Sequence, residues 1–422
     1  MRYCPRFCLA VLLAVSAAIV TASSAEPVHV PLGSPNFRPT PQHPFGWRGD
    51  GSGRFPGATP VTEWSATKNV RWATAVGRSF SSPIVTDTFV FVTSEPNLLL
   101  CLDRADGHVR WKAQVKPADL ADETARTAAA KNEIPPDGSG LAAATPLTDG
   151  KNIYVIFANG IICALDLDGR RLWTVGIVAD PTTGYGRSSS PILVAGKLIA
   201  HVSNLYAFDP ATGRQLWVNT GAKSSYGTPT GLKVGDTDLL VTPNGDVVRV
   251  TDGKSVNSDI ARAIHSSPIS IGEGVVCFGD GTVSALQLNS AFKEAEVWNA
   301  MVTGEVFGSP LLHDHTLFMI SGAGELFGFD ARGTAAQESL FKDRKLFESE
   351  ANAGPVVYAS LTLAGKHLFL TSNKGETVVL EATREAKVVS RNRLPAGTGS
   401  SPVFSGGDMF LRAGEKLYCI GR

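Results

Sequence analysis

The chain has 422 residues, with 39 basic and 39 acidic side chains, 43 glycines and 25 prolines. The balanced charge excludes the strongly basic surface that nucleic-acid or anionic-membrane binding needs. The many glycines and prolines favour a fold of short strands and tight turns.

Residues 1–25 have the form of a secretory signal. Arg2 and Arg6 precede an apolar run over residues 9–20, and Ser23-Ser24-Ala25 forms a small-residue cleavage site. The run is too short for a comfortable membrane span, and no later stretch is apolar enough to form one. We therefore expect an exported protein, periplasmic or extracellular, without a membrane span.

Residues 26–66 are rich in Pro and Gly, which predicts an extended lead-in that lies along the body of the protein or is partly disordered. Within it, Arg48-Gly49-Asp50 matches a cell-adhesion tripeptide, and Asp50 to Gly53 resembles the start of a cation-binding loop. The spacing and the closing Glu of such a loop are missing, so turn formation is the simpler explanation of both.

From residue 67 onward the chain repeats one unit, shown most plainly by residues 189–217. The unit opens with a small residue before Pro191, turns at Gly196-Lys197 between two apolar runs, and ends with a Gly213 turn before Trp217. Period-two patterning and these turns predict four short antiparallel strands. The opening step recurs as Ser82-Pro83, Thr145-Pro146, Ser190-Pro191, Thr228-Pro229, Ser267-Pro268, Ser309-Pro310 and Ser401-Pro402, with Ala359-Ser360-Leu361 as a degenerate copy.

Units of about 44 residues have the length of a four-stranded propeller blade. The sequence thus predicts an all-β, eight-bladed β-propeller over residues 67–422, with seven blades as the alternative because one late unit lacks its Pro and Trp. Residues 69–76 look like a fourth strand without the first three, whereas the last unit has only three strands. We expect the N-terminal strand to close the ring as the outermost strand of the last blade, giving a monomer.

The stretch from Ala207 to Trp217 resembles the A-x-D-x-x-T-G-x-x-x-W repeat of PQQ-like β-propeller proteins. The segments 47–53, 63–65 and 69–72 resemble the lead-in of a bacterial exported subgroup. The superfamily includes quinoprotein alcohol dehydrogenases and the propeller lipoprotein of the outer-membrane barrel-assembly machinery. The resemblance implies the fold, while the function stays open because the fold hosts enzymes, scaffolds and binders.

An insertion at residues 116–140 separates the first unit from the second. Its alanines and early acidic residues predict one helical segment that is broken at Pro135-Pro136. In the PQQ-like family this connection lies on the face that carries the active site or ligand. A lid and a plain surface excursion are equally compatible with the sequence.

The cysteines of the mature chain favour packing over chemistry. PQQ alcohol dehydrogenases typically carry two adjacent cysteines beneath the cofactor, and no such pair is present. Cys101 and Cys419 share a third-strand position that is otherwise occupied by small residues. We expect free, buried thiols. The cysteines are Cys101, Cys163, Cys277 and Cys419, and the small residues are Ala164, Ala207, Ala285 and Gly328.

His313-Asp314-His315 is the most suggestive metal-binding pattern. It aligns with the hairpin turn between the first and second strands of a unit, where polar residues are expected for any function. A third protein ligand is not evident. We predict a turn and no metal site.

Side chains just before each opening step are expected to surround the central funnel. Aromatic faces with Arg and Lys suit a planar anion, a sugar or a peptide segment. The adjacent hydroxyls, such as those of Ser189 and Ser190, are expected to satisfy backbone groups at the axis. The candidate site residues are Arg78, Phe80, Tyr185, Arg187, Lys223, Tyr226, His265, Glu305 and Phe307.

The leading interpretation is an exported non-catalytic scaffold that binds a protein segment or small ligand through this funnel, without a cofactor. The first alternative is a PQQ-dependent alcohol or sugar dehydrogenase, in which Arg78 or Arg187 pairs with the PQQ carboxylates and Ca²⁺ sits at the quinone. Glu305 is then the only clear funnel carboxylate, fewer than Ca²⁺ prefers. The second alternative is a carbohydrate-binding module that stacks sugars on Tyr185 and Tyr226.

Overall fold

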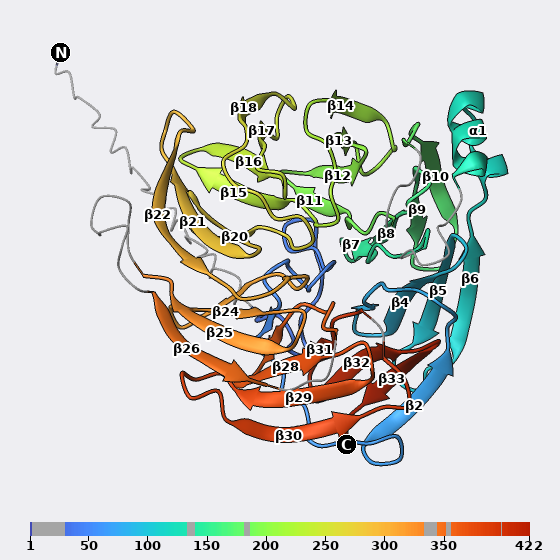
Figure 1. Ribbon diagram of the computed structural model, residues 1–422. Coiled ribbons are helices and arrows are strands. Elements are labelled where there is room, and N and C mark those ends of the chain that lie inside the picture. Colours follow the sequence, from blue (N-terminus) through green and yellow to red (C-terminus); the bar gives the residue numbers. More distant parts are fainter. Residues whose placement is uncertain (2–29, 133–139, 181–185, 333–343, 352–355, 398) are drawn as a thin grey trace.

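The computed structural model describes residues 1, 30–132, 140–180, 186–332, 344–351, 356–397 and 399–422. These residues form eight sheets around a central axis, an all-β propeller of eight blades (Figure 1). The prediction of eight blades is confirmed, and the seven-bladed alternative is wrong. The degenerate unit around Ser360 forms a complete blade, because its inner strands keep the short apolar, buried runs of the other units even without the opening Pro.

The strands follow the chain from the axis outward in each blade. Blade 1 contains β3 (Ile84–Val85), β4 (Phe89–Ser94), β5 (Leu98–Asp103) and β6 (Val109–Gln114), and blade 2 contains β7 (Leu147–Thr148), β8 (Asn152–Ile156), β9 (Ile161–Asp166) and β10 (Arg171–Gly176). Blade 3 contains β11 (Ile192–Val194), β12 (Lys197–Val202), β13 (Asn204–Phe208) and β14 (Gln215–Asn219), and blade 4 contains β15 (Thr230–Val234), β16 (Thr237–Val241), β17 (Val247–Arg249) and β18 (Ser255–Asn257).

The second half of the ring repeats this order. Blade 5 contains β19 (Ile269–Gly272), β20 (Val275–Gly279), β21 (Thr282–Leu288) and β22 (Glu294–Met301), and blade 6 contains β23 (Leu311–His313), β24 (Thr316–Ile320), β25 (Glu325–Asp330) and β26 (Lys345–Glu350). Blade 7 contains β27 (Thr362–Ala364), β28 (His367–Thr371), β29 (Glu376–Glu381) and β30 (Val388–Arg393), and blade 8 contains β31 (Val403–Ser405), β32 (Asp408–Ala413) and β33 (Lys416–Ile420).

Blade 8 is completed from the other end of the chain. Strand β2 (Val70–Ala75) pairs antiparallel with β33, with Trp72 opposite Cys419. The N-terminal strand is therefore the outermost strand of the last blade, as the sequence predicts. This pairing joins the two ends of the ring through backbone hydrogen bonds.

One contact seals four successive interfaces between blades. A Trp on an outer strand covers a Gly in a turn of the next blade, and its indole N–H donates to a carbonyl of that turn at 2.9–3.0 Å. These glycines have φ between 72° and 85°, which a side chain would strain. The pairs are Trp72 with Gly107, Trp111 with Gly169, Trp173 with Gly213 and Trp217 with Gly253.

The small third-strand residues lie directly opposite these large rings. Cys101 pairs with Trp111 and Cys419 with Trp72, and the alanines and Gly328 face the equivalent residues of other blades. All four cysteines described are free and buried, as predicted. Burial raises the pKa of Cys101 to about 12, so the thiol stays protonated and unreactive.

Hydroxyl groups link the blades at the axis. The backbone N–H of the small residue before each opening Pro donates to the hydroxyl at the same position of the next blade, at 2.8–3.1 Å. Between blades 7 and 8, the Ser401 hydroxyl donates instead to the Ser360 carbonyl at 3.1 Å. The prediction that the hydroxyls satisfy backbone groups is confirmed for Ser190 and its equivalents, whereas the buried Ser189 hydroxyl has no hydrogen-bond partner among the described residues. This hydroxyl ring consists of Ser82, Thr145, Ser190, Thr228, Ser267, Ser309, Ser360 and Ser401.

The described part of the lead-in crosses the centre of the propeller (Figure 1). Strand β1 (Arg54–Phe55) pairs in parallel with β27, and Phe45 forms a bridge to Thr148 of β7. Arg48 is only 1% exposed and donates to the Pro310 and Leu361 carbonyls, so the arginine of the adhesion-like tripeptide is buried although Asp50 is exposed. The Asp50 carboxylate accepts hydrogen bonds from Ser52, which confirms its role in a turn.

The insertion forms the 3-10 helix η1 (Pro117–Asp119) and the helix α1 (Glu123–Lys131), capped by Asp122. Leu120 and Ala125 pack on Gly176 of β10, so α1 lies at the rim of blade 2 and not over the axis (Figure 1). Pro135-Pro136 lies outside the described residues. In the described part of the chain, no helix is long and apolar enough to cross a membrane.

Candidate functional site at the funnel mouth

The loops that enter the innermost strands place one residue per blade around the mouth of the funnel. This residue stands three positions before the opening Pro, or before Leu361 in blade 7. We name the set the mouth ring. It consists of Phe80, Ala143, Ser188, Tyr226, His265, Phe307, Tyr358 and Gly399.

Four consecutive members of the mouth ring are aromatic and touch one another. Tyr226 stacks on His265 with ring centroids 5.1 Å apart, and His265 meets Phe307 at 5.0 Å. Phe307 makes an edge-to-face contact with Tyr358 at 4.9 Å. These distances are typical of favourable aromatic pairs. We call these four residues the aromatic arc.

The arc continues to Phe80 across a glycine. A Cβ atom at Gly399 would lie 3.1 Å from Phe80 Cδ1 and 3.2 Å from Tyr358 Cβ. The missing side chain therefore leaves room for both rings. The predicted site residues Phe80, Tyr226, His265 and Phe307 thus form one surface together with Tyr358.

Tyr358 belongs to the site but is absent from the sequence-based candidates. It is 44% exposed and contacts Phe307. Blade 7 has no opening Pro to fix the alignment of its loop, so no candidate was placed in that blade. Counting three residues back from Leu361 would have found it.

The predicted basic residues mainly tie neighbouring loops together. Arg187 donates to the carbonyls of Ala158 and Asp180, and burial lowers the pKa of its guanidinium. Lys223 is exposed and its Nζ lies 2.7 Å from Asn204 Oδ1. These cations are therefore held by protein oxygens close to the mouth.

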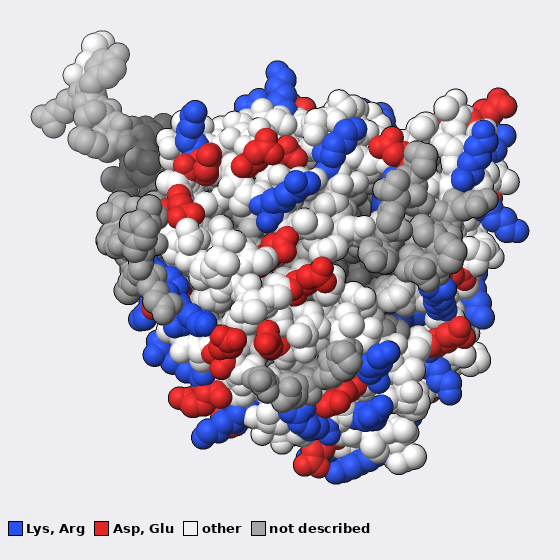
Figure 2. Space-filling view, viewed as in Figure 1, with Lys and Arg blue, Asp and Glu red and all other residues white. Residues whose placement is uncertain are grey.

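The remaining predicted residues differ in surroundings. Arg78 is exposed, and its carbonyl accepts a hydrogen bond from the backbone of Glu95. Glu305 is exposed next to the Phe307 loop. Tyr185 lies outside the described residues. Viewed along the axis, acidic side chains lie near the middle of the face that is shown, and most other charged side chains lie towards the rim (Figure 2).

Two buried titratable groups, which sequence reasoning missed, support the loops behind the mouth. Arg412 is fully buried and donates to the Gly77 and Thr93 carbonyls, each at 2.7 Å. Desolvation lowers its pKa to about 9. His201 contacts the Ala222 carbonyl at 3.3 Å, and desolvation lowers its pKa to about 4. Nothing in the repeat pattern marks these positions, because only the fold places them in the interior.

The metal-like pattern is a turn. Asp314 and His315 have φ of 43° and 61° between β23 and β24, the geometry of a tight hairpin. Among the residues that the structure describes, no three His, Cys, Asp or Glu side chains gather as they would around a metal ion.

The repeat, the closure and the site can now be compared with known proteins. A family model described as outer membrane protein assembly factor BamB matches residues 61–333. The chain belongs to this family of PQQ-like propellers. A comparison with curated protein sequences finds no match.

Solved structures share the fold at low sequence identity. BamB from Moraxella catarrhalis is 13% identical with a TM-score of 0.57, over 83% of this chain and 96% of that one. The quinohemoprotein alcohol dehydrogenase ADHIIG from Pseudomonas putida HK5 is 13% identical with a TM-score of 0.54, over 86% and 74%. A europium-containing methanol dehydrogenase is 12% identical with a TM-score of 0.55, over 85% and 87%. Dehydrogenases and BamB are both represented at 13% identity or less, so these likenesses show the fold alone.

Proposed function

We propose that this propeller is an exported, non-catalytic scaffold that binds an extended protein segment at the funnel mouth. The observation that carries the proposal is the aromatic arc, four touching rings on one side of the mouth ring. Membership of a family described by an outer membrane protein assembly factor supports a protein-binding role.

The chemistry of the arc favours a polypeptide with apolar side chains. Tyr358 is 44% exposed, and Ile264, beside His265 in the sequence, is 46% exposed. Exposed rings that are held rigid by their neighbours lose little entropy on binding and are typical anchors of protein interfaces. Because Arg187 and Lys223 are already engaged by protein oxygens, apolar contact should contribute more than charge pairing.

A peptide titration tests this proposal. The probes are two fluorescein-labelled 12-residue peptides: one alternates Phe and Thr, and the other has Ser in place of each Phe. We expect the aromatic peptide to bind, and Phe307→Ala and Tyr358→Ala each to weaken it about tenfold or more. Leu172→Ala, an equally exposed residue on β10 at the rim, is the matched control and should leave affinity unchanged. Equal binding of both peptides, or arc variants without effect, would contradict the proposal.

The second candidate is a quinoprotein oxidoreductase, favoured by the structural likeness to two dehydrogenases. A Ca²⁺ ion at a quinone needs several oxygen ligands. Among the described residues, no three His, Cys, Asp or Glu side chains gather as they would around such an ion, and Glu305 is exposed at the mouth. Titration with PQQ and Ca²⁺, followed by absorbance and Tm, separates the two candidates. Saturable binding with a raised Tm would favour the oxidoreductase function over the scaffold function.

A carbohydrate-binding module would use the same rings to stack sugars. Maltohexaose and cellohexaose, titrated against the same arc variants, provide that comparison. Binding of a sugar that competes with the aromatic peptide would reassign the ligand class.

Export is part of the proposal and rests on residues 1–25. We expect the mature protein from its native host to begin at Glu26, as measured by N-terminal sequencing. Recovery of the chain with Met1 intact would contradict export. The binding proposal does not depend on this result and would be tested separately.

A further inference from the structure

We propose a second binding site, independent of the mouth ring, at the inner edges of blades 3 and 4. The inner edge is the side of an innermost strand that faces the axis. The geometry points to an extended peptide segment as the occupant, which would join β11 or β15 as an added strand next to Trp47.

The chain itself shows that inner edges accept an extended segment. In blade 7, the Leu363 N–H donates to the Gly53 carbonyl at 2.9 Å, and β1 lies in parallel along β27. In blade 2, Thr148 and Phe45 exchange two backbone hydrogen bonds at 2.8 and 2.9 Å. β1 has only two residues, so a very short strand is enough. Adding a strand to an exposed sheet edge is a common mode of peptide binding.

In blades 3 and 4, the backbone N–H and C=O groups at the positions equivalent to Leu363 and Thr148 also point to the axis. Leu363 and Thr148 both stand two residues after the opening position of their blade, and Leu193 and Gly231 stand there too. In antiparallel pairs, successive residues alternate between bonding to the partner strand and pointing away from it. Leu193 pairs with Leu198 in the same register as Leu363 with Leu368. Gly231 has the same orientation, because the carbonyl of Lys233, two residues further on, points away from β16 and accepts a hydrogen bond from the Gly274 N–H.

These two edges are not covered by the described lead-in. The residues of β27 and β7, which the lead-in covers, are all buried, whereas the three residues of β11 are all half-buried. On the axial side neither Leu193 nor Gly231 has a hydrogen-bond partner within the described residues. An unpaired strand edge with apolar flanks favours pairing with another chain.

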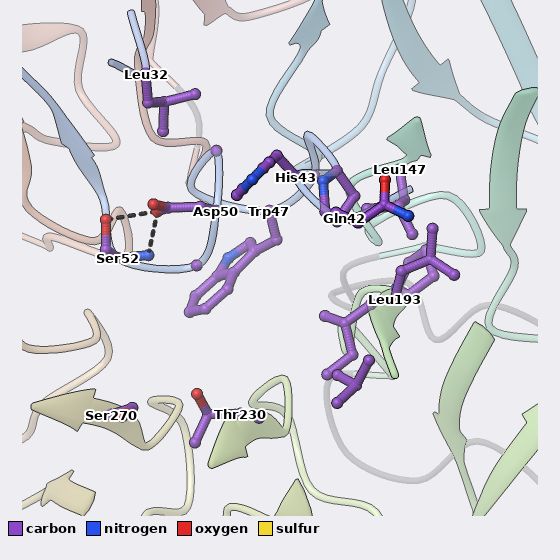
Figure 3. A pocket seen from close by; sticks show the side chains of 18 of the residues that line it. Leu32, Gln42, His43, Trp47, Asp50, Ser52, Leu147, Leu193, Thr230 and Ser270 are labelled. Carbon is purple, nitrogen blue, oxygen red and sulfur yellow. Dashed lines mark hydrogen bonds between the residues drawn. The ribbon is translucent and has the colours of Figure 1, made fainter. Parts of the chain in front are cut away.

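A cavity of about 380 Å³ lies over both edges. Its walls are the lead-in on one side and Leu193, Val194 and Gly231 on the other, and the Trp47 ring projects into it between them (Figure 3). This volume is at the lower end of the range for small-molecule sites. It suits two or three residues of a peptide, comparable with the two residues of β1.

The surroundings specify the class of peptide. The Trp47 ring and the Leu193 side chain offer apolar contact to alternate side chains of an added strand. Asp50 lies at the border of the cavity and is exposed, so a basic side chain at one end of the peptide would be favourable. The site therefore fits an extended segment with apolar residues at alternate positions.

The site differs from the mouth in position. The lead-in contacts the turns that follow the innermost strands, through Thr59 with Gly406 and Phe55 with Gly365. The mouth ring lies in the loops that precede those strands. Variants at one site can thus leave the other intact.

Gly231 offers a clean substitution. A Cβ atom there would meet Val194 at ordinary contact distances of 3.4 and 3.5 Å, and the glycine does not need positive φ. Gly231→Val should therefore fold normally while narrowing the cavity. Gly281→Val is the matched control, because that glycine also lacks positive φ and has no atom within 4 Å of the added Cβ.

The experiment selects binders from a random hexapeptide display library on the full-length mature protein. We expect binders with alternating apolar residues that lose at least tenfold in affinity to Gly231→Val and keep it with Gly281→Val and Phe307→Ala. Amide hydrogen exchange should show that the Leu193 and Gly231 amides exchange faster than those of Leu363 and Thr148 in the free protein, and become protected when the peptide binds.

Two outcomes would overturn the site. One is a selection that yields no peptide sensitive to Gly231→Val, with the Tm of that variant unchanged. The other is slow exchange of the Leu193 and Gly231 amides in the free protein, which would show that the edges are already occupied. Binders sensitive only to Phe307→Ala would support the funnel proposal and reject this one.

Discussion

The hydroxyl ring and the mouth ring lie two residues apart in every blade, yet they differ in how strictly they repeat. The hydroxyl ring has Ser or Thr in all eight blades and forms a hydrogen-bonded chain from blade to blade. The mouth ring contains aromatic residues in five blades and Ala, Ser or Gly in the other three.

The strict repetition of the hydroxyl ring indicates that the fold requires it, whereas the fold tolerates different residues in the mouth ring. A buried backbone N–H at the axis needs an acceptor, and in seven blades the hydroxyl of the next blade supplies it, while between blades 7 and 8 a hydroxyl donates to a backbone carbonyl instead. The mouth positions other than Ala143 are half-buried or exposed, and they share no single hydrogen-bonding role: the Ser188 hydroxyl donates to the Tyr226 carbonyl, whereas four others form the aromatic arc. Their clustering in blades 4 to 7 and 1 is therefore a feature that the fold does not impose, which is why we assign binding to it.

The largest expected effect is at the interfaces between blades. Trp217→Ala removes a ring that covers Gly253 and an N–H bonded to the Val250 carbonyl at 2.9 Å. We expect a loss of about 3–5 kcal/mol in the free energy of unfolding, measured by urea denaturation. A loss below about 1 kcal/mol would show that the repeated Trp contact is not what holds the blades together.

Much of this framework could be predicted from sequence. The repeat fixed the blade count, the closure by β2 and the small residues opposite the tryptophans, because each depends on a period that is visible along the chain. The sequence also pointed to the mouth positions Tyr226, His265 and Phe307. It could not reveal Tyr358, where the opening Pro is missing, nor the burial of His201, which depends on contacts between distant segments. The path of the lead-in across the axis was equally hidden, because that segment has no periodicity.

The next largest effect is a dependence of stability on pH through His201, which belongs to the framework and is 1% exposed. In the unfolded chain this ring binds a proton below about pH 6.5, whereas burial lowers its pKa to about 4 in the folded protein. Between these values the unfolded chain binds more protons, so the free energy of unfolding should fall as pH drops from 6.5 to 4, by up to roughly 3 kcal/mol. His201→Gln should flatten this part of the pH profile. Parallel profiles for the two proteins would contradict the assignment.

A smaller effect distinguishes the two rings directly. Ser309→Ala leaves the buried N–H of Ser267 without its acceptor and should cost about 1–3 kcal/mol in the free energy of unfolding. Ser309→Thr is the matched control, since Thr145 and Thr228 fill the same role in other blades. Equal stability of the Ala and Thr variants would mean that water replaces the hydroxyl, and the ring would then be dispensable.

The smallest expected effect is at the mouth, where the comparison is sharpest. Tyr358 stands two residues before Ser360 of the hydroxyl ring, and its side chain is 44% exposed and contacts Phe307 edge to face. Tyr358→Ala should change the free energy of unfolding by about 0.5 kcal/mol or less, measured by calorimetry beside Ser309→Ala. A loss as large as that of Ser309→Ala would make the arc part of the packing, and its clustering would then need no ligand. An unchanged stability together with weakened peptide binding would instead assign Tyr358 to ligand contact, because a side chain that binds peptide without stabilising the fold acts through what it contacts outside the chain.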